Sequence, residues 1–220
     1  MIRLAIFDLD GTLLNTIRDL GESVNYALDQ CGFPTHDIEL YPGFVGNGVN
    51  KLIELTLPEG QKTESNILQV KSHFVKYYDS HNTIYSAPYP GIPALLEWLD
   101  SQSVVLAVAS NKYQFATCKL IDHYFSSISF HTVLGQREDF PIKPDPAIVL
   151  HILSATGISP EETIYIGDSG VDMLTASRAS TSSVGVTWGF RPKSELIESG
   201  ACYIVDNPEE IIHLCKSNVF

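Results

Sequence analysis

Positive charge is scarce in this sequence. Its 220 residues include 14 Lys and Arg against 26 Asp and Glu, which gives a formal net charge of −12. Binding to the phosphates of nucleic acids or to anionic membranes requires clustered Lys and Arg side chains. The charge balance therefore argues against nucleic acid and membrane partners and favours small molecules.

Metal and disulfide motifs built on cysteine or histidine are also missing. The four cysteines, Cys31, Cys118, Cys202 and Cys215, lie far apart without a CxxC pair, and the seven histidines include no HExxH. This spacing predicts neither a zinc site nor a disulfide framework. We expect reduced, buried thiols in a cytoplasmic protein.

Long hydrophobic runs are absent as well. The first apolar run is short and is broken by Asp8. No later run approaches the roughly 20 residues that a membrane-spanning helix needs. We therefore expect no secretory signal, no membrane segment and a location in the cytoplasm.

The sequence does contain alternating apolar runs and amphipathic stretches. Hydrophobic residues make up 44% and charged residues 18%, as in a globular protein with a sizeable core. Short apolar runs predict strands at residues 4–7, 104–109, 130–134, 163–166, 183–186 and 203–205. Apolar residues at helical spacing predict helices at 16–30, within 43–57, and at 63–78, 92–101, 113–124 and 147–156.

This alternation predicts an α/β fold with a mostly parallel sheet and helices on both of its faces. Residues 15–85 interrupt the pattern, because they show helical spacing and no clear strand. We expect them to form an inserted helical domain, with residues 1–14 and 86–220 building the core.

The strongest local signal is LAIFDLDGTLLNT, at residues 4–16. Side chains alternate along a strand, so Asp8 and Asp10 point to the same side, and Gly11 permits a sharp turn. A folded protein usually tolerates such a pair of carboxylates with a cation or a proton between them, and a divalent metal is the simplest solution. An ordinary surface turn is the alternative.

Polar residues directly follow three of the predicted strands: Asp8 and Asp10, Ser110 and Asn111, and Asp168. Ligands of parallel sheets bind beyond the carboxyl ends of the strands. We therefore expect one site, in which Asp8, Asp10 and Asp168 supply the oxygen ligands that Mg²⁺ prefers.

Four further residues complete the predicted site. Lys143 lies in a proline-rich loop and balances the acidic cluster, while Ser110 and Asn111 offer neutral donors to phosphoryl oxygens. Asp172 has two interpretations of equal weight: it holds metal-bound water from outside the ligand shell, or it stabilises the start of the following helix.

Such a site suits phosphoryl transfer, where positioning and charge neutralisation supply most of the catalysis. Asp8 is the predicted nucleophile and becomes an aspartyl phosphate. Asp10 protonates the leaving oxygen and then deprotonates the water that cleaves the intermediate.

In their order along the chain, four motifs resemble those of the haloacid dehalogenase superfamily: DLDGT at 8–12, Ser110-Asn111, Lys143-Pro144, and Gly167-Asp168-Ser169 with Asp172. The resemblance implies a Rossmann-like core, Mg²⁺, and a helical cap at residues 15–85. It also implies that Asp8 is the nucleophile, Asp10 the acid and base, Ser110 and Lys143 phosphate ligands, and Asp168 a metal ligand. The aspartate at position 10 indicates a phosphohydrolase.

Three stretches are similar to phosphoglycolate phosphatases: GFVGNGV at 43–49, SNK at 110–112 and VTWGFRP at 186–192. Phosphatases of sugar phosphates, nucleotides or pyrophosphate share these features and remain alternatives. Lys51 is predicted either to meet a substrate carboxylate or to be an exposed helix lysine. Trp188 is predicted either to border the site or to pack in the core.

Three other classes fit the sequence less well. A phospho-acceptor signalling domain has a shorter chain without a helical insert, and Gly43, Gly46 and Gly48 do not form the GxGxxG of a dinucleotide-binding domain. The complete set of Asp8, Asp10, Lys143 and Asp168 argues against an inactive binding paralogue. A cap also implies opening and closing, with hinges near 14–16 and 85–90.

Overall fold

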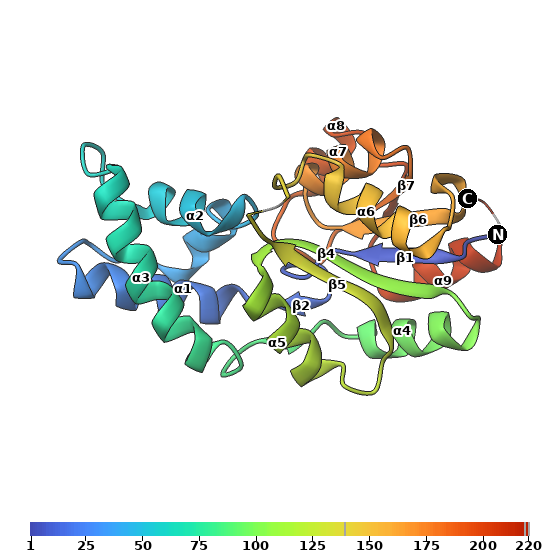
Figure 1. Cartoon of the computed structure of the whole chain (residues 1–220), viewed down its shortest axis with the longest axis horizontal. Coiled ribbons are helices and arrows are strands. Elements are labelled where there is room, and N and C mark those ends of the chain that lie inside the picture. Colours follow the sequence, from blue (N-terminus) through green and yellow to red (C-terminus); the bar gives the residue numbers. More distant parts are fainter. Residues whose placement is uncertain (139, 218, 220) are drawn as a thin grey trace.

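The structure, a computed structural model, describes residues 1–138, 140–217 and 219. Strands and helices alternate along most of the chain (Figure 1). In chain order the elements are β1 Leu4–Phe7, β2 Leu14–Asn15, α1 Ile17–Gln30, η1 Ile38–Gly43, α2 Gly48–Thr56, α3 Glu64–His81, β3 Ala87–Pro88, α4 Ile92–Ser101, β4 Val105–Tyr113, α5 Gln114–Tyr124, β5 Phe130–Gln136, α6 Ala147–Thr156, η2 Pro160–Glu162, β6 Thr163–Gly167, α7 Gly170–Arg178, β7 Ser182–Val186, α8 Lys193–Glu198, β8 Tyr203–Val205 and α9 Pro208–Lys216.

The main sheet has the strand order β5-β4-β1-β6-β7-β8, and every neighbouring pair is parallel. Strand β1 lies between β4 and β6, with Phe7 opposite Val108 on one side and Ile166 on the other. The carboxyl ends of these three strands therefore meet at one edge of the sheet. The predicted α/β class with a parallel sheet is confirmed.

Side-chain alternation along β1 places apolar residues on both faces of the sheet. Ala5 and Phe7 belong to the apolar cluster that contains Leu95 of α4 and Leu120 of α5. Leu4 and Ile6 belong to the opposite cluster, which contains residues of α6 and α7. Figure 1 shows α4 and α5 on one side of the sheet and α6 and α7 on the other. This two-sided burial explains the continuous apolar run at 4–7.

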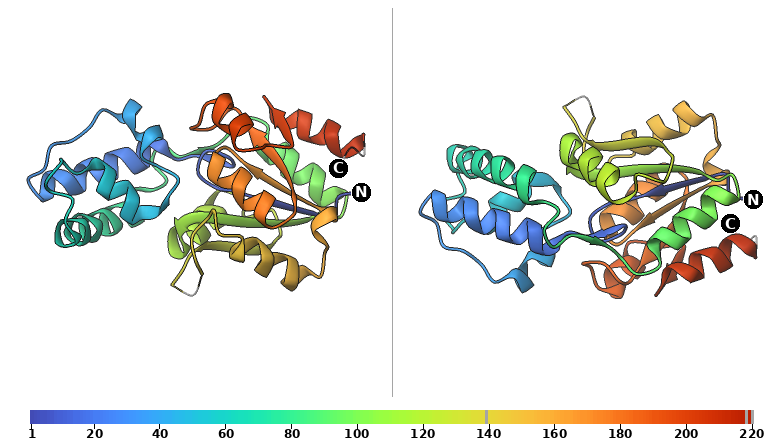
Figure 2. Two further views of the ribbon diagram at one scale, coloured as in Figure 1. Left: turned by 90° about the horizontal axis from the view of Figure 1, so that it is seen from above. Right: turned by 90° about the horizontal axis from the view of Figure 1, so that it is seen from below.

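Helices α1, α2 and α3, with the short 3-10 helix η1, lie beyond one end of the main sheet (Figure 2). Their buried side chains form a separate apolar cluster, to which α3 contributes Val70, Phe74 and Tyr78 at helical spacing. Thr63 accepts a hydrogen bond from Asn66 N and so caps the start of α3. The helical character predicted for this part of the chain is confirmed.

The two connections between these helices and the sheet pair with each other. Strands β2 and β3 are antiparallel, with Leu14 opposite Pro88 and Asn15 opposite Ala87. The expectation of no strand within 15–85 is therefore wrong at Asn15. Its short pairing has no sequence signal of its own, because β2 and β3 are only two residues long each.

Strand β4 is longer than predicted, since it continues through Ser110, Asn111 and Lys112 to Tyr113. Its register against β5 shifts between Ala109 and Tyr113, as in a β-bulge. Ser110, Asn111 and Lys112 remain in the strand through this shift, and all three line the pocket described below.

The cysteines are all free, and none of them is fully buried. The prediction of reduced thiols is thus consistent with the structure, but the predicted burial is wrong, and Cys202 is exposed. None of the helices in the described ranges combines the length and the apolar character needed to cross a membrane.

Candidate active site

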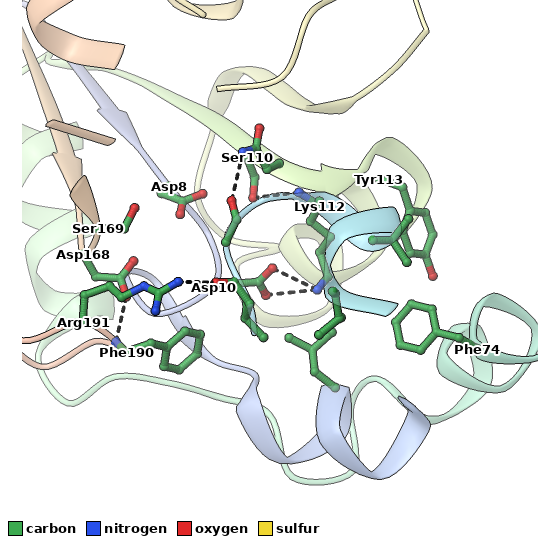
Figure 3. Close-up of a pocket in the computed structure, with 17 residues that line it drawn as sticks. Asp8, Asp10, Phe74, Ser110, Lys112, Tyr113, Asp168, Ser169, Phe190 and Arg191 are labelled. Atoms are coloured by element: carbon green, nitrogen blue, oxygen red, sulfur yellow. Dashed lines mark hydrogen bonds and ion pairs between the residues drawn. The ribbon is translucent and has the colours of Figure 1, made fainter. Parts of the chain in front are cut away.

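A pocket opens at the edge of the sheet where β1, β4 and β6 end (Figure 3). Its polar wall includes Asp8, Asp10 and Asp168, which come from the ends of β1 and β6. Apolar side chains of the helical segment, residues 15–85, form the opposite wall. They come from α1, α2, α3 and the loop before α2, and they are Leu20, Val45, Val49, Leu52 and Phe74. The site therefore lies between the sheet and the helices of residues 15–85.

Asp8 is buried at the end of β1, with 9% of its surface exposed. Its Oδ1 lies 3.0 Å from Lys143 Nζ but accepts no hydrogen bond from the described residues. Burial raises the pKa of Asp8 to about 6, the charge of Lys143 opposes this rise, and those of Asp172 and Asp10 add to it. The carboxylate is thus ionised at neutral pH, and Lys143 is its ion-pair partner.

Lys143 is almost completely buried and is not among the residues that line the pocket. Its Nζ donates to Asp172 Oδ1 at 2.8 Å, to Ala109 O at 2.9 Å and to the Tyr165 hydroxyl at 3.0 Å. Burial opposes the ammonium charge, but Asp172 and Asp8 outweigh it and hold the pKa of Lys143 well above its usual value. Lys143 is therefore a fixed positive charge behind Asp8.

Asp168 packs directly against two glycines, where any side chain would collide with it. A Cβ at Gly11, where φ is +85°, would lie 2.3 Å from Asp168 Oδ2, and a Cβ at Gly189 would lie 2.3 Å from Asp168 Cβ. Phe190 N donates to Oδ2 at 2.7 Å. Burial, then Asp172 and Asp8, raise the pKa of Asp168 well above its usual value. The backbone at Gly11, Gly189 and Phe190 therefore fixes the position of this buried carboxylate.

The arrangement of these carboxylates fits a divalent cation. Carboxylate oxygens of Asp8, Asp168 and Asp172 lie within 4.8 Å of one another, and this is the group of potential metal ligands found among the described residues. Several buried acidic oxygens around one point, one of them without a hydrogen bond, are the hard ligands that Mg²⁺ prefers. Asp10, which was predicted as a ligand, is not part of this group.

Asp172 is fully buried at the start of α7. Ser169 N and Oγ donate to its Oδ2 at 3.1 and 2.6 Å, and together with the bond from Asp172 N to Ser169 Oγ they form a capping box. Its Oδ1 accepts from Lys143. Asp172 therefore stabilises the helix start and also anchors the lysine behind Asp8.

The carboxylate of Asp10 has its own partners. Lys112 Nζ donates to Oδ1 at 3.0 Å and to Oδ2 at 3.1 Å, and Thr16 Oγ1 donates to Oδ1 at 2.6 Å. The ammonium of Lys112 also lies 4.7 Å from the centre of the Tyr78 ring, on α3. Asp10 is thus oriented by residues of the sheet and of the helical segment.

Ser110 and Asn111 differ in what they offer to a ligand. Ser110 lines the pocket, and its Oγ accepts a hydrogen bond from Lys112 N at 3.3 Å, so its hydroxyl proton remains available. Both amide hydrogens of Asn111 are engaged, with Gly46 O at 2.9 Å and Lys143 O at 3.1 Å. Asn111 therefore joins the loop before α2, at Gly46, to the loop that holds Lys143, and this disfavours direct donation to a phosphate.

Lys51 and Trp188 lie outside the residues that line the pocket. Lys51 pairs with Glu54 at 3.0 Å on the exposed side of α2, as its second interpretation predicted. Trp188 packs against the core, and its Nε1 donates to Thr12 O at 3.1 Å. The pocket lining also includes Lys112, Phe190 and Arg191, for which the sequence predicted no role.

The sequence model of the haloacid dehalogenase-like hydrolases matches residues 5–186. The chain belongs to this family. Its predicted similarity to the phosphoglycolate phosphatase subgroup is also confirmed: a phosphoglycolate phosphatase of Haemophilus influenzae is 33% identical, over 94% of this chain and 95% of that protein. One of Aquifex aeolicus is 29% identical over 99% of both.

Solved structures agree with these relatives. A protein of Haemophilus somnus, whose description as a phosphoglycolate phosphatase is itself a prediction, superposes with a TM-score of 0.89 at 29% identity, covering 97% of this chain and 98% of that one. A haloacid dehalogenase-like protein of Streptococcus pneumoniae reaches 0.87 at 25% identity, covering 97% and 98%. The chain is a phosphatase, in the class of phosphoric monoester hydrolases.

Proposed function

We propose that this phosphatase cleaves small phosphate monoesters with the help of Mg²⁺ and through an aspartyl phosphate on Asp8. The observation that carries the proposal is the position of Asp8. Its buried carboxylate lies at the pocket, 3.0 Å from the fixed charge of Lys143, with Asp10 and Ser110 in the same lining. These groups are the ones that a phosphoryl-transfer site needs.

In the proposed reaction, Asp8 attacks phosphorus as the bond to the leaving oxygen breaks, and Asp10 donates a proton to that oxygen. Asp10 then takes a proton from the water that attacks the aspartyl phosphate, which releases inorganic phosphate and restores Asp8. Lys143 and the Ser110 hydroxyl neutralise the phosphoryl oxygens throughout.

Asp8 and Asp168 are the proposed side-chain ligands of Mg²⁺, with Asp172 beside them. Bound Mg²⁺ lowers the repulsion between the anionic substrate and the carboxylates. Asp10 was predicted as a third ligand from its spacing to Asp8. Lys112 and Thr16 instead orient its carboxylate, for which we propose the acid and base role alone.

The proposed substrate is 2-phosphoglycolate. The two curated relatives described above carry the name of this activity. Sugar phosphates, nucleotides and pyrophosphate are the alternatives that the assay below separates.

We also propose that residues 15–85 act as a cap over a core made of 1–14 and 86–220. The apolar wall that these helices contribute to the pocket supports this division, because it excludes water from the reacting groups. The proposed partner is a small soluble phosphate ester, handled in the cytoplasm and without nucleic acid.

The test is the release of inorganic phosphate from 2-phosphoglycolate, glucose 6-phosphate, AMP, pyrophosphate and an aryl phosphate, with and without Mg²⁺. We expect 2-phosphoglycolate to have the highest kcat/KM and Asp8→Asn to abolish release. A preference for another substrate keeps the mechanism and rejects 2-phosphoglycolate, whereas measurable turnover by pure Asp8→Asn rejects Asp8 as nucleophile.

Metal binding is tested separately from turnover. A saturating ligand at about 100 times its Kd stabilises a fold by about 2.7 kcal/mol. At 2–4 °C per kcal/mol for a chain of this size, Mg²⁺ raises the melting temperature by roughly 5–10 °C. We expect this shift in the wild type and its loss in Asp168→Asn. An equal shift in both proteins contradicts the proposed ligand.

A further inference from the structure

Arg191 lies in the connection between β7 and α8 and lines the pocket. Its side chain is 20% exposed. Figure 3 shows it extending from beside Asp168 into the group of pocket side chains. A long cationic side chain that is largely buried at an active-site pocket is costly unless its charge has a partner there.

The described contacts of Arg191 compensate that charge poorly. Its Nη2 donates to Val45 O at 2.8 Å, a neutral carbonyl of the loop before α2. Its Nε lies 3.8 Å from Glu195 Oε1, beyond hydrogen-bonding distance, and that oxygen accepts instead from Gly170 N at 2.9 Å. Among the described residues, one of the five N–H groups of the guanidinium thus has a hydrogen-bond partner.

The other positive charges at this site are already paired. Lys112 is bound to both carboxylate oxygens of Asp10, and Lys143 to Asp8 and Asp172. Facing them, the wall from the helical segment is apolar. Arg191 is therefore the cation in the pocket lining whose N–H groups are still available to an anionic group on the leaving part of a substrate.

We infer that Arg191 determines substrate specificity by binding the acidic group on the leaving part of the substrate, which is the carboxylate of 2-phosphoglycolate. The inference deepens the proposed function and rests on it. A guanidinium and a carboxylate form two parallel hydrogen bonds, so the contact selects a planar anion over a neutral group of the same size.

Arg191 also contacts the proposed cap, through its hydrogen bond to Val45 O. Arg191 donates to Val45 O, and Asn111 donates to the neighbouring Gly46 O at 2.9 Å. Two side chains of the core thus bind the cap loop that contains Val45 and Gly46. A carboxylate bound to Arg191 then lies against this loop. Substrate recognition and closure of the loop over the pocket are thereby linked through one side chain.

The test compares 2-phosphoglycolate with its amide, 2-phosphoglycolamide, which has the same shape without the negative charge. Steady-state kcat/KM is measured with Mg²⁺ for the wild type, Arg191→Met, Arg191→Lys and the control Lys51→Met. Lys51, on α2, is a cation that pairs with Glu54 outside the pocket lining. Thermal melting of every variant verifies folding.

We expect Arg191→Met to lower kcat/KM for 2-phosphoglycolate about 10- to 100-fold, as for loss of a hydrogen-bonded charge, with little change for the amide. Arg191→Lys recovers part of the preference, and Lys51→Met leaves it unchanged. If Arg191→Met lowers kcat/KM equally for both substrates, Arg191 has a purely structural role and the inference is overturned. A selective loss of kcat/KM for 2-phosphoglycolate in Lys51→Met overturns it as well.

The failure of the inference is distinguishable from the failure of the proposed function. A wild type that cleaves the amide as well as 2-phosphoglycolate remains a phosphatase of small esters, but recognition by Arg191 is then rejected. A wild type that releases phosphate from no ester in the panel rejects the proposed function and this inference with it.

Discussion

Lys112 and Asp10 are 102 positions apart in the sequence, yet the ammonium of Lys112 bridges both carboxylate oxygens of Asp10 at 3.0 and 3.1 Å. The pair is largely buried, with exposures of 3% and 12% for the two side chains. It joins the end of β4 to the turn after β1. Asp10, the proposed acid and base, is therefore held by Lys112, a residue to which the family motifs gave no role.

Replacing Lys112 by Met leaves Asp10 with Thr16 as its remaining hydrogen-bond donor. Removing one member of a buried ion pair costs about 3–5 kcal/mol, and somewhat less here because Asp10 is partly exposed. We expect a loss of about 2–3 kcal/mol in the free energy of unfolding by urea, and a fall in kcat of at least tenfold. Lys51→Met, which breaks an exposed pair, is the control and costs under about 1 kcal/mol. Equal losses in the two variants contradict the assignment.

The buried carboxylate of Asp8 makes the metal-free protein sensitive to pH. Its pKa is about 6 in the folded chain, against an ordinary value of 3.8. Between these values the folded chain binds more protons than the unfolded chain, so the free energy of unfolding falls as the pH rises through this window and stays low above it. A full shift of two units corresponds to about 3 kcal/mol, shared here among coupled carboxylates.

This dependence is measured by urea unfolding in EDTA at about pH 4.5 and pH 7.5. Asp8→Asn removes the titrating group, so we expect its stability relative to the wild type to increase by roughly 1–3 kcal/mol from the lower to the higher pH. Asp100→Asn, on the exposed surface of α4, is the control and shows no such change. A pH-independent difference for Asp8→Asn contradicts the pKa shift.

Gly189→Ala tests the packing around Asp168. The added Cβ would lie 2.3 Å from Asp168 Cβ and 2.4 Å from Gly11 O, distances that force the loop or the carboxylate to move. We expect the Mg²⁺-dependent rise in melting temperature to be lost or halved and kcat to fall by at least tenfold, because an error of about 1 Å at a catalytic group is costly.

Gly43→Ala is the matched control, since a Cβ at Gly43 meets nothing within 4 Å and its backbone needs no positive φ. We expect its melting temperature and its response to Mg²⁺ to equal those of the wild type. A Gly189→Ala protein that behaves like Gly43→Ala shows that the loop yields without disturbing Asp168.

Asp19 of α1 holds the chain segment that returns from the helices to the sheet. Its buried carboxylate accepts hydrogen bonds from Tyr85 N, Ser86 N and Ser86 Oγ, at 2.7–3.1 Å. Asp19→Ala leaves the two backbone donors without this partner. We expect a loss of about 2–4 kcal/mol and faster proteolysis near residues 82–88.

Glu22→Ala is the control for Asp19, because Glu22 is on the same helix but pairs with Arg18 at the surface, at 3.7 Å. We expect its stability to change by less than about 1 kcal/mol and its cleavage pattern to be that of the wild type. If limited proteolysis cuts the Asp19→Ala protein no faster than this control, the anchoring role is wrong.

Local patterns in the sequence were sufficient for most of the fold. The run at residues 4–7 is apolar at every position because β1 is buried on both faces. Thr163–Gly167 in β6 is likewise buried at every position, and its centre is apolar. The end of β4 was misjudged because polar residues there indicated a loop. A bulge against β5 keeps them in the strand instead, and such pairing depends on the neighbouring strand.

The carboxylates of the site could be located from the sequence because each follows a buried strand directly. Lys112 and Arg191 could not, because their partners, Asp10 and Val45, are 102 and 146 positions away. The one available signal for Lys112 was its place just after Ser110 and Asn111. Lys51 was predicted either to meet a substrate carboxylate or to be an exposed helix lysine, and its pairing with Glu54 on the surface of α2 fits the second alternative.

The pairing of β2 with β3 has a mechanical consequence. The helical segment is attached to the sheet through two chain crossings, and these are bonded to each other at Leu14–Pro88 and Asn15–Ala87, with a further bond from Tyr89 N to Leu13 O at 3.1 Å. Two separate tethers would let the segment slide and twist freely. A single two-stranded ribbon resists sliding and bends about one axis. We therefore expect the helical segment to open by a hinge rotation about this ribbon, which exposes the whole pocket wall in one step.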